Sequence, residues 1–209
     1  MAFKKVSMIA ACCQNNGIGI KGNLPWRLKN EMAYFTRITS DTKDPTKKNA
    51  VIMGRKSWDS IPNKYKPLPG RVNAVVSLTM SPKPKQGRAI LGRSNSQNNE
   101  GDKSVDYGGV AEPDYVFKNL TEAISYLNQQ DDVENIFIIG GQQVYQLGMK
   151  EPTVTRIYLT RIQALFECDT FFPEIDMNQW SDVTIPTVPT EEQSERDIKY
   201  KFHVYERNN

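Results

Sequence analysis

The sequence contains one histidine and three cysteines in 209 residues, and it has no CxxC motif. With His203 as the only imidazole, neither a His-based metal site nor a Ser/His/Asp triad is favoured. We expect His203, in an alternating C-terminal run, to be an ordinary strand residue. Cys12 and Cys13 are adjacent, which does not suit a disulfide framework. Free thiols favour a reducing compartment, so we expect a cytoplasmic protein.

Long hydrophobic runs are also absent. No run approaches the roughly 20 apolar residues of a membrane span, so we expect no membrane partner. The run after Lys4 and Lys5 is similar to the start of a signal peptide, but it is short and leads into Gln-Asn-Asn-Gly. We therefore interpret residues 6–13 as a buried first strand. The net charge of +3 is too small to indicate DNA or RNA as the main partner, although it would suit a small anionic ligand.

Strand-like apolar runs alternate with helical patterns along the chain. This alternation predicts one α/β domain, residues 1–209, with a central, mostly parallel twisted sheet flanked by helices and ending in an antiparallel C-terminal strand. No feature indicates an oligomer, so we expect a monomer. The predicted strands cover residues 6–13, 50–53, 72–78, 115–117, 136–139, 156–162, 180–185 and 198–205. The predicted helices cover residues 28–39, 55–60, 120–127 and 142–147.

One segment breaks this rhythm. Residues 81–113 are dominated by Ser, Asn, Gln, Gly, Lys and Pro and have almost no apolar spacing. We interpret them as a polar surface insertion, a loop or a disordered segment, rather than as a second domain.

An acidic residue interrupts the apolar stripe of the first predicted helix. Residues 28, 32, 35, 38 and 39 fall on one face at helical spacing, and Glu31 falls within that face. A buried carboxylate is costly unless it is paired, and burial raises its pKa towards neutral pH. With Trp26 just before the helix, Glu31 is a candidate proton donor or a clamp for a cationic group.

Three glycine-bearing turns follow predicted strands. In an open α/β sheet, ligands bind beyond the carboxyl ends of the strands, so these turns are candidate ligand sites. Residues 16–23 could form a lid over Glu31 or a plain flexible turn. Residues 54–57, Gly-Arg-Lys-Ser, could bind the 2′-phosphate of NADP or be a basic surface turn. Residues 140–143, Gly-Gly-Gln-Gln, could hold a pyrophosphate or be a tight turn, since the full G-x-G-x-x-G is missing.

A fourth turn, residues 67–71, is stiffened by two prolines and delivers Arg71 to the start of a strand. Arginine binds a carboxylate through two parallel hydrogen bonds, although a surface arginine is the commoner explanation for such a turn read alone.

Together these segments resemble the dihydrofolate reductase family, in its eukaryotic rather than its short bacterial form. The resemblance spans nearly the whole chain outside residues 81–113. It is carried by Gly17-Ile18-Gly19, Leu24-Pro25-Trp26, Glu31-x-x-x-Phe35, Val51-Ile52-Met53-Gly54-Arg55-Lys56-Ser57-Trp58, Ser60-Ile61-Pro62, Pro67-Leu68-x-Gly70-Arg71, Ile139-Gly140-Gly141, Thr160-Arg161-Ile162, Asp169-Thr170-Phe171-Phe172-Pro173 and Tyr200-x-Phe202-x-Val204-Tyr205.

The resemblance implies reduction of 7,8-dihydrofolate to tetrahydrofolate with NADPH, which supplies one-carbon metabolism, and it implies binding of folate and of antifolate inhibitors. Glu31 would bind the pterin amino group and N3 and assist protonation of N5, through water near Trp26. Thr160 would hydrogen-bond the acid, and Arg71 would bind the glutamate α-carboxylate. We expect no thymidylate synthase fused in this polypeptide.

The same resemblance implies further site residues. The catalytic set would be Glu31, Trp26, Leu24 and Thr160. The substrate would contact Ile9, Ala11, Glu31, Met32, Phe35, Ser60, Ile61, Leu68, Arg71, Ile139 and Tyr145. The cofactor would contact Ala11, Ile18, Gly19, Gly22, Asn23, Gly54, Arg55, Lys56, Ser57, Ser77, Leu78, Thr79, Lys118, Ile139, Gly140, Gly141, Gln142, Gln143, Val144 and Tyr145.

Some positions depart from the family pattern. Met32 replaces an aromatic residue of vertebrate members, and Leu78 replaces an arginine near the 2′-phosphate, so the preference for NADP would rest on Arg55 and its neighbours. At the adenosine end, either Arg93 or Lys118 could be equivalent, and we prefer Lys118. Two other functions stay open from the sequence: a related pteridine or pyrimidine reductase, and a catalytically silent nucleotide- or RNA-binding module.

Overall fold

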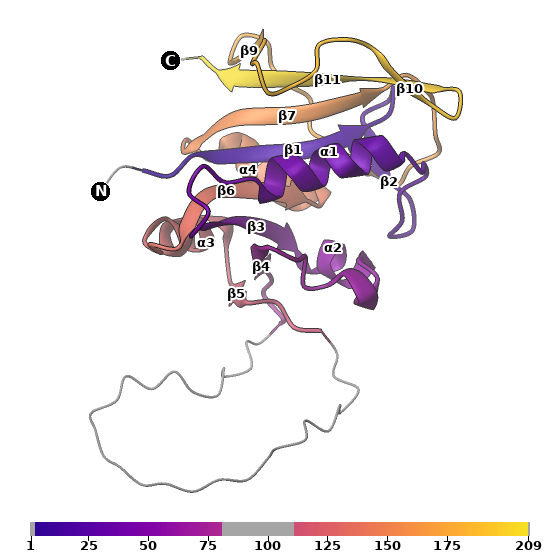
Figure 1. Ribbon diagram of the computed structural model, residues 1–209. Helices are drawn as coiled ribbons and strands as arrows, with labels where there is room; N and C mark the ends of the chain where they lie inside the picture. Colours follow the sequence, from indigo (N-terminus) through magenta and orange to yellow (C-terminus); the bar gives the residue numbers. More distant parts are fainter. Residues whose placement is uncertain (1–2, 81–110, 209) are drawn as a thin grey trace, which may run out of the picture.

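Six parallel strands form the centre of one large sheet in the computed structural model, which describes residues 3–80 and 111–208 (Figure 1). The sheet runs β10-β11-β7-β1-β6-β3-β4-β5, and the strands from β7 to β5 are parallel, as the sequence predicts. The parallel strands are β1 (Val6–Cys12), β3 (Lys48–Gly54), β4 (Arg71–Val76), β5 (Tyr115–Phe117), β6 (Val133–Gly140) and β7 (Val154–Ile162).

The antiparallel end of the sheet is built on β11 (Ile198–Arg207), which pairs with β7, β9 (Trp180–Val183) and β10 (Gln193–Glu195). The two predicted C-terminal runs therefore do form an antiparallel pair. The sequence analysis missed β10 and a second small sheet, in which β2 (Gly17–Gly19) pairs with β8 (Thr170–Phe171). These strands are too short to show an alternating pattern.

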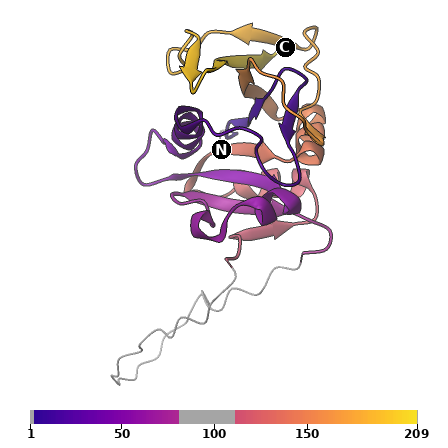
Figure 2. The ribbon, with the colours of Figure 1, turned by 90° about the vertical axis from the view of Figure 1, so that its right-hand side faces the viewer.

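Helices cover both faces of the sheet, α1 and α2 on one face and α3 and α4 on the other (Figure 2). Alternate residues of the central strands supply the two apolar layers, so Val51 and Met53 pack on the α1 side and Ala50 and Ile52 on the α3 side. Burial on both faces explains why these strands read as continuous apolar runs. The helices are α1 (Lys29–Ser40), α2 (Arg55–Ser60), α3 (Leu120–Asn128), α4 (Gln142–Lys150) and the 3₁₀ turn η1 (Asn63–Tyr65).

Helix α1 differs from its predicted packing at one position. Glu31 and Thr39 are buried and Phe35 and Ile38 are half-buried, but Met32 is 44% exposed, so its predicted burial is wrong. Tyr34 is buried instead, and its ring stacks on Phe202 of β11 with centroids 3.9 Å apart. This contact turns the helix so that Met32 lies at the border of the buried face.

Three further local predictions are confirmed. The backbone N–H of Glu122 donates to the Asn119 side chain at 2.8 Å, which is the predicted cap of α3. His203 is satisfied by Asp182, with 2.8 Å between Nδ1 and Oδ2. Cys12, Cys13 and Cys168 are free thiols.

Arg93 and most of the predicted insertion lie outside the described residues, which resume at position 111. In the described part of the chain, no helix combines the length and the apolar character needed to cross a membrane.

The carboxyl ends of β1 and β3 point to the same end of the sheet, where β2 and α2 lie (Figure 1). The turn between β6 and α4 belongs to this end too, because β6 lies parallel between β1 and β3. This edge is therefore where side chains from several distant segments meet.

Candidate functional site

A buried carboxyl group lies near the start of α1. Glu31 is 6% exposed, and Thr160 of β7 donates from Oγ1 to Glu31 Oε1 at 3.1 Å. Burial raises the pKa of Glu31 from its ordinary 4.5 to about 7; the Thr160 hydrogen bond lowers it, and the charge of Glu195 raises it further. Glu31 can therefore hold or release a proton near neutral pH, as the sequence analysis expected of a buried acid.

A second buried polar group belongs to Trp26, which precedes the helix. Its ring is 5% exposed and packs on Phe166, with centroids 5.6 Å apart. Its indole Nε1 is buried and has no hydrogen-bond partner among the described residues. A buried donor without a partner is costly, so this N–H is available for a water molecule or a ligand.

The apolar side chains predicted to hold the substrate come from several elements. Ile9 and Trp26 belong to the apolar layer beneath α1, and the half-buried Ala11, Phe35, Ile61, Leu68 and Ile139 pack against it. Tyr145 belongs to the opposite layer, where its hydroxyl donates to the carbonyl oxygen of Ile9 at 2.7 Å. Three members of the predicted catalytic and substrate sets are exposed, namely Leu24, Met32 and Ser60.

Arg71 is a buried cation without an acidic partner in the described residues. It is 6% exposed, so it is not the surface arginine that the turn alone would suggest. Its Nε donates to the carbonyl oxygen of Pro69 at 3.1 Å, and its NH1 donates to Thr39 Oγ1 at 2.7 Å. Both partners are neutral, and burial lowers the pKa of the guanidinium. A carboxylate ligand would supply the missing negative charge.

Asn73 holds the turn that presents Leu68 and Arg71. It is fully buried, and its Oδ1 accepts from the Leu68 N–H at 2.8 Å. Its Nδ2 donates to the carbonyl oxygens of Leu68 and Arg71, both at 3.0 Å. The sequence analysis missed this residue, although a polar side chain within an apolar strand is the same kind of signal as Glu31. Gly70, at φ 71°, provides the left-handed position of the turn.

The glycine turns after β3 and β6 pack against each other. A Cβ on Gly141 would lie 2.9 Å from Ser57 Oγ, and one on Gly54 would lie 3.1 Å from Val144 Cγ2. These contacts leave little room for a side chain at either glycine. The close approach brings together the predicted cofactor residues of the two turns and of α4, which are Gly54, Arg55, Lys56, Ser57, Gly140, Gly141, Gln142, Gln143, Val144 and Tyr145.

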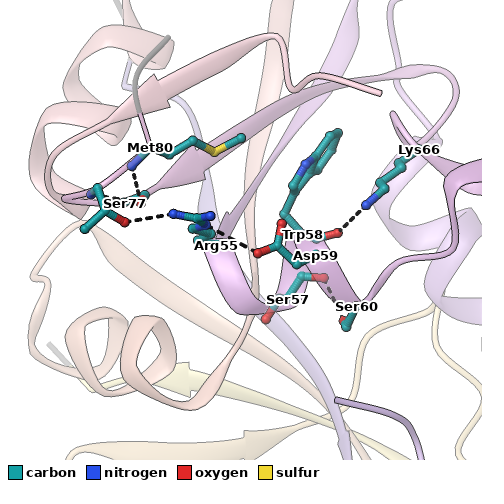
Figure 3. Close-up of polar contacts among 9 residues, drawn as sticks. Arg55, Ser57, Trp58, Asp59, Ser60, Lys66, Ser77 and Met80 are labelled. Atoms are coloured by element: carbon teal, nitrogen blue, oxygen red, sulfur yellow. Dashed lines mark hydrogen bonds and ion pairs between the residues drawn. The ribbon is translucent and has the colours of Figure 1, made fainter. Parts of the chain in front are cut away.

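Basic side chains flank the turn that follows β4. Arg55 NH1 donates to Thr79 Oγ1 at 3.0 Å, and the Lys118 ammonium donates to the carbonyl oxygen of Leu78 at 3.3 Å. Ser77 holds this turn by accepting from the N–H of Met80 at 3.0 Å, and Arg55 also contacts Asp59 (Figure 3). Arg93 lies outside the described residues, so our preference for Lys118 stays a prediction. Leu78, where vertebrate members would carry an arginine, is 79% exposed.

The predicted lid segment is tied at Gly19 to Asp169 and Thr170. Gly19 accepts from Asp169 N at 3.0 Å and from Thr170 Oγ1 at 3.1 Å. Ile20 and Asn23 exchange two backbone hydrogen bonds of 2.9 Å, which close the loop containing Gly22. Ile18 and Gly19 lie in β2, whereas Gly22 and Asn23 lie at the exposed tip.

Comparisons with known proteins agree with this arrangement. The family model described as dihydrofolate reductase matches residues 5–106 and 102–207. The chain is 44% identical to the dihydrofolate reductase of Heliothis virescens over 207 residues, which cover 99% of this chain and 100% of that protein. It is 39% identical to that of Gallus gallus over 210 residues, with 98% and 97% covered. The structure of Schistosoma mansoni dihydrofolate reductase matches with a TM-score of 0.74 and 32% identity, covering 98% of this chain and 99% of that one.

The raised pKa of Glu31 predicts a pH-dependent stability difference. Between pH 4.5 and about 7 the folded protein binds more protons than the unfolded chain, so Glu31 makes folding less favourable as pH rises through this window. Glu31→Gln cannot ionise and should therefore exceed the wild type in unfolding free energy by roughly 2 kcal/mol at pH 8, and by much less at pH 5. Urea unfolding at both pH values measures this. The exposed Glu167→Gln controls for net charge, and an equal difference at both pH values would contradict the assignment.

Proposed function

The chain belongs to the dihydrofolate reductase family, whose members use a nicotinamide cofactor, and on this premise we propose that it reduces 7,8-dihydrofolate with NADPH to 5,6,7,8-tetrahydrofolate. The reaction transfers a hydride to C6 of the pterin and a proton to N5. Its product would supply one-carbon metabolism for thymidylate and purine synthesis. We also propose that the protein acts as a monomer in the cytoplasm, and its three free thiols support the reducing location.

The observation that carries this proposal is the buried carboxyl of Glu31. A pterin presents an amino group and a ring N–H side by side, which match the two oxygens of one carboxylate. Burial strengthens such hydrogen bonds, and it keeps both partners from bonding to water instead. With a pKa of about 7, Glu31 also holds a proton in part of the molecules at neutral pH. The unpartnered Trp26 Nε1 would hold a water molecule that relays this proton towards N5.

The other parts of the substrate match the remaining side chains. The apolar residues beneath α1 would pack on the pterin and benzoyl rings and exclude bulk water from the reacting atoms. Arg71 would bind the α-carboxylate of the glutamate tail, since its guanidinium is buried and bonded only to neutral oxygens. A substrate with a pterin at one end and a carboxylate at the other fits this pair of charges better than a small pteridine does.

The basic residues around the turn after β4 support NADPH rather than NADH. Bound NADPH supplies the hydride, and the 2′-phosphate distinguishes it from NADH. Arg55 and Lys118 flank the Ser77–Met80 turn, and the hydroxyls of Ser77 and Thr79 lie at the same turn. These groups are donors of the kind that bind a phosphate monoester. The close approach of the glycine turns would accommodate the pyrophosphate.

Replacing Glu31 tests the proposed chemistry directly. Glu31→Gln keeps the shape and one acceptor but cannot carry the proton, so dihydrofolate turnover at pH 7 should fall by about 100-fold or more. Spectrophotometric NADPH oxidation measures this, with Glu167→Gln as the surface control. Wild-type enzyme should be far less active on dihydrobiopterin than on dihydrofolate. Full turnover by Glu31→Gln would rule out the role assigned to the acid.

Replacing Arg71 tests the predicted carboxylate contact. Arg71→Gln should raise KM for dihydrofolate roughly 10- to 100-fold, the loss expected for a charge-assisted pair, with a smaller effect on kcat. For 6-methyldihydropterin, which lacks the glutamate tail, KM should change little. An equal rise in KM for both substrates would mean that Arg71 stabilises the turn and does not bind the glutamate tail.

Replacing Arg55 tests cofactor choice. Arg55→Gln should raise KM for NADPH about 10-fold while KM for NADH stays near its wild-type value, because NADH has no 2′-phosphate. The effect should weaken at high salt, since Arg55 is exposed. If both cofactors lose affinity equally, Arg55 does not discriminate between them.

A further inference from the structure

The start of α1 is capped by a carboxylate from the far end of the chain. Lys29 N donates to Glu195 Oε1 at 2.7 Å, and Asn30 N donates to Glu195 Oε2 at 2.9 Å. The residue at the N-cap position, Leu28, makes no side-chain cap. Glu195 therefore satisfies two backbone donors that a local Ser, Thr, Asp or Asn would usually satisfy.

The position of Glu195 is fixed by a tight hairpin. Arg196 and Asp197 both have left-handed backbone angles, with φ of 52° and 63°, and they join β10 to β11. Two consecutive left-handed residues make the turn that suits a two-residue hairpin. Glu195 pairs with Ile198 across it. The hairpin lies at the end of the sheet where α1 begins (Figure 1).

The same hairpin is rigidly joined to the other partner of Glu31. Strand β11 pairs with β7, and the register places Phe202 opposite Thr160. Thr160 donates to Glu31, while Glu195 binds the backbone of the two residues before it. Glu31 and the start of its helix are thus both bonded to the antiparallel unit of β7, β11 and β10.

Glu195 also changes the electrostatic environment of the acid. An ionised carboxylate in the first turn of a helix is ordinarily stabilised by the free N–H groups and the positive end of the helix dipole. Glu195 occupies two of those N–H groups and adds a negative charge. The other titratable groups that face Glu31 are Tyr34 of α1, Tyr145 of α4 and Tyr200 of β11, which are neutral near pH 7. Two cations, Lys29 and Arg196, help to lower the pKa of Glu195 and keep it ionised, and the charge of Glu195 in turn raises the pKa of Glu31.

We propose that Glu195 is a positioning residue for the reduction: its carboxylate fixes the start of α1 and sets a negative charge at the end of the helix that carries Glu31. The proposal rests on the role of Glu31 as the proton-bearing acid. It assigns a function in catalysis to a hairpin that contributes no residue to the expected substrate or cofactor contacts.

A titration of Glu31 in the free protein tests the proposal without reference to turnover. Samples are labelled with ¹³C at the glutamate carboxyl, and the Glu31 signal is assigned by its loss in Glu31→Gln. Glu195→Gln keeps the shape and an acceptor but removes the charge. Its Glu31 midpoint should fall by about half a pKa unit, a roughly three-fold loss of proton affinity. Glu195→Thr, a second neutral variant suited to a strand, should shift the midpoint in the same direction.

Glu192→Gln is the matched control. It removes a charge near the same hairpin, where Glu192 pairs with Lys199 and accepts from Gln163, and it should leave the Glu31 midpoint in place. The pH profile of kcat/KM provides a second measurement. Glu195→Gln should match the wild type near pH 5.5 and lose roughly three-fold in activity above pH 7.5.

An unchanged Glu31 midpoint in both neutral variants overturns the proposal. So does a loss of kcat/KM that is equal at every pH, because that pattern indicates a cap with no effect on the acid. If Glu31→Gln keeps full turnover, the proposed function of Glu31 fails, whereas the carboxyl titration still reports whether Glu195 acts on it.

Discussion

A carboxyl group buried among apolar side chains is the constraint on which this site depends. Isolation from water makes an ionised carboxylate costly, so the surrounding chain must supply polar partners or leave the group protonated. The protein does both in part: Thr160 gives one hydrogen bond, and the pKa of Glu31 is raised to about 7. A surface acid would be ionised at neutral pH and could not bring a proton to the reaction. Helix α1 carries this group, and β7 and the β10–β11 hairpin contribute hydrogen bonds to it or to the start of its helix.

The two arginines expected to bind the ligands lie in different surroundings. Arg71 would bind the carboxylate of the substrate, and Arg55 the phosphate of the cofactor. Arg71 is buried and bonded to neutral oxygens, so its attraction for a carboxylate is little screened by salt. Arg55 is exposed and already contacts Asp59 and Thr79, so its attraction for a phosphate is weaker and more easily screened. The substrate would therefore gain more of its binding energy from one buried ionic contact, and the cofactor from several exposed contacts.

Features with a local origin could be predicted from the sequence. The continuous apolar strands, the Asn119 cap, the glycine turns and the buried acid each carry a signal within a few residues, and the structure agrees with them. The packing of Met32 and Tyr34 could not be predicted, because the rotation of α1 depends on Phe202 near the other end of the chain. The cap joins Glu195 to Lys29, 166 positions away, and no local pattern predicts it. Contacts between distant segments, rather than weak local structural propensities, limit what can be predicted from the sequence.

The order in which the chain is synthesised affects when Glu31 and its helix gain their hydrogen-bond partners. Helix α1 is synthesised early, but Thr160 follows Glu31 by 129 residues and Glu195 follows Lys29 by 166. At translation rates of about 5–20 residues per second, the helix waits roughly 8 to 30 seconds for its hairpin. Until both segments are made, α1 lacks the hydrogen bond from Thr160 and the cap from Glu195. The surroundings that raise the pKa of Glu31 are therefore complete only once segments far apart in the chain have come together.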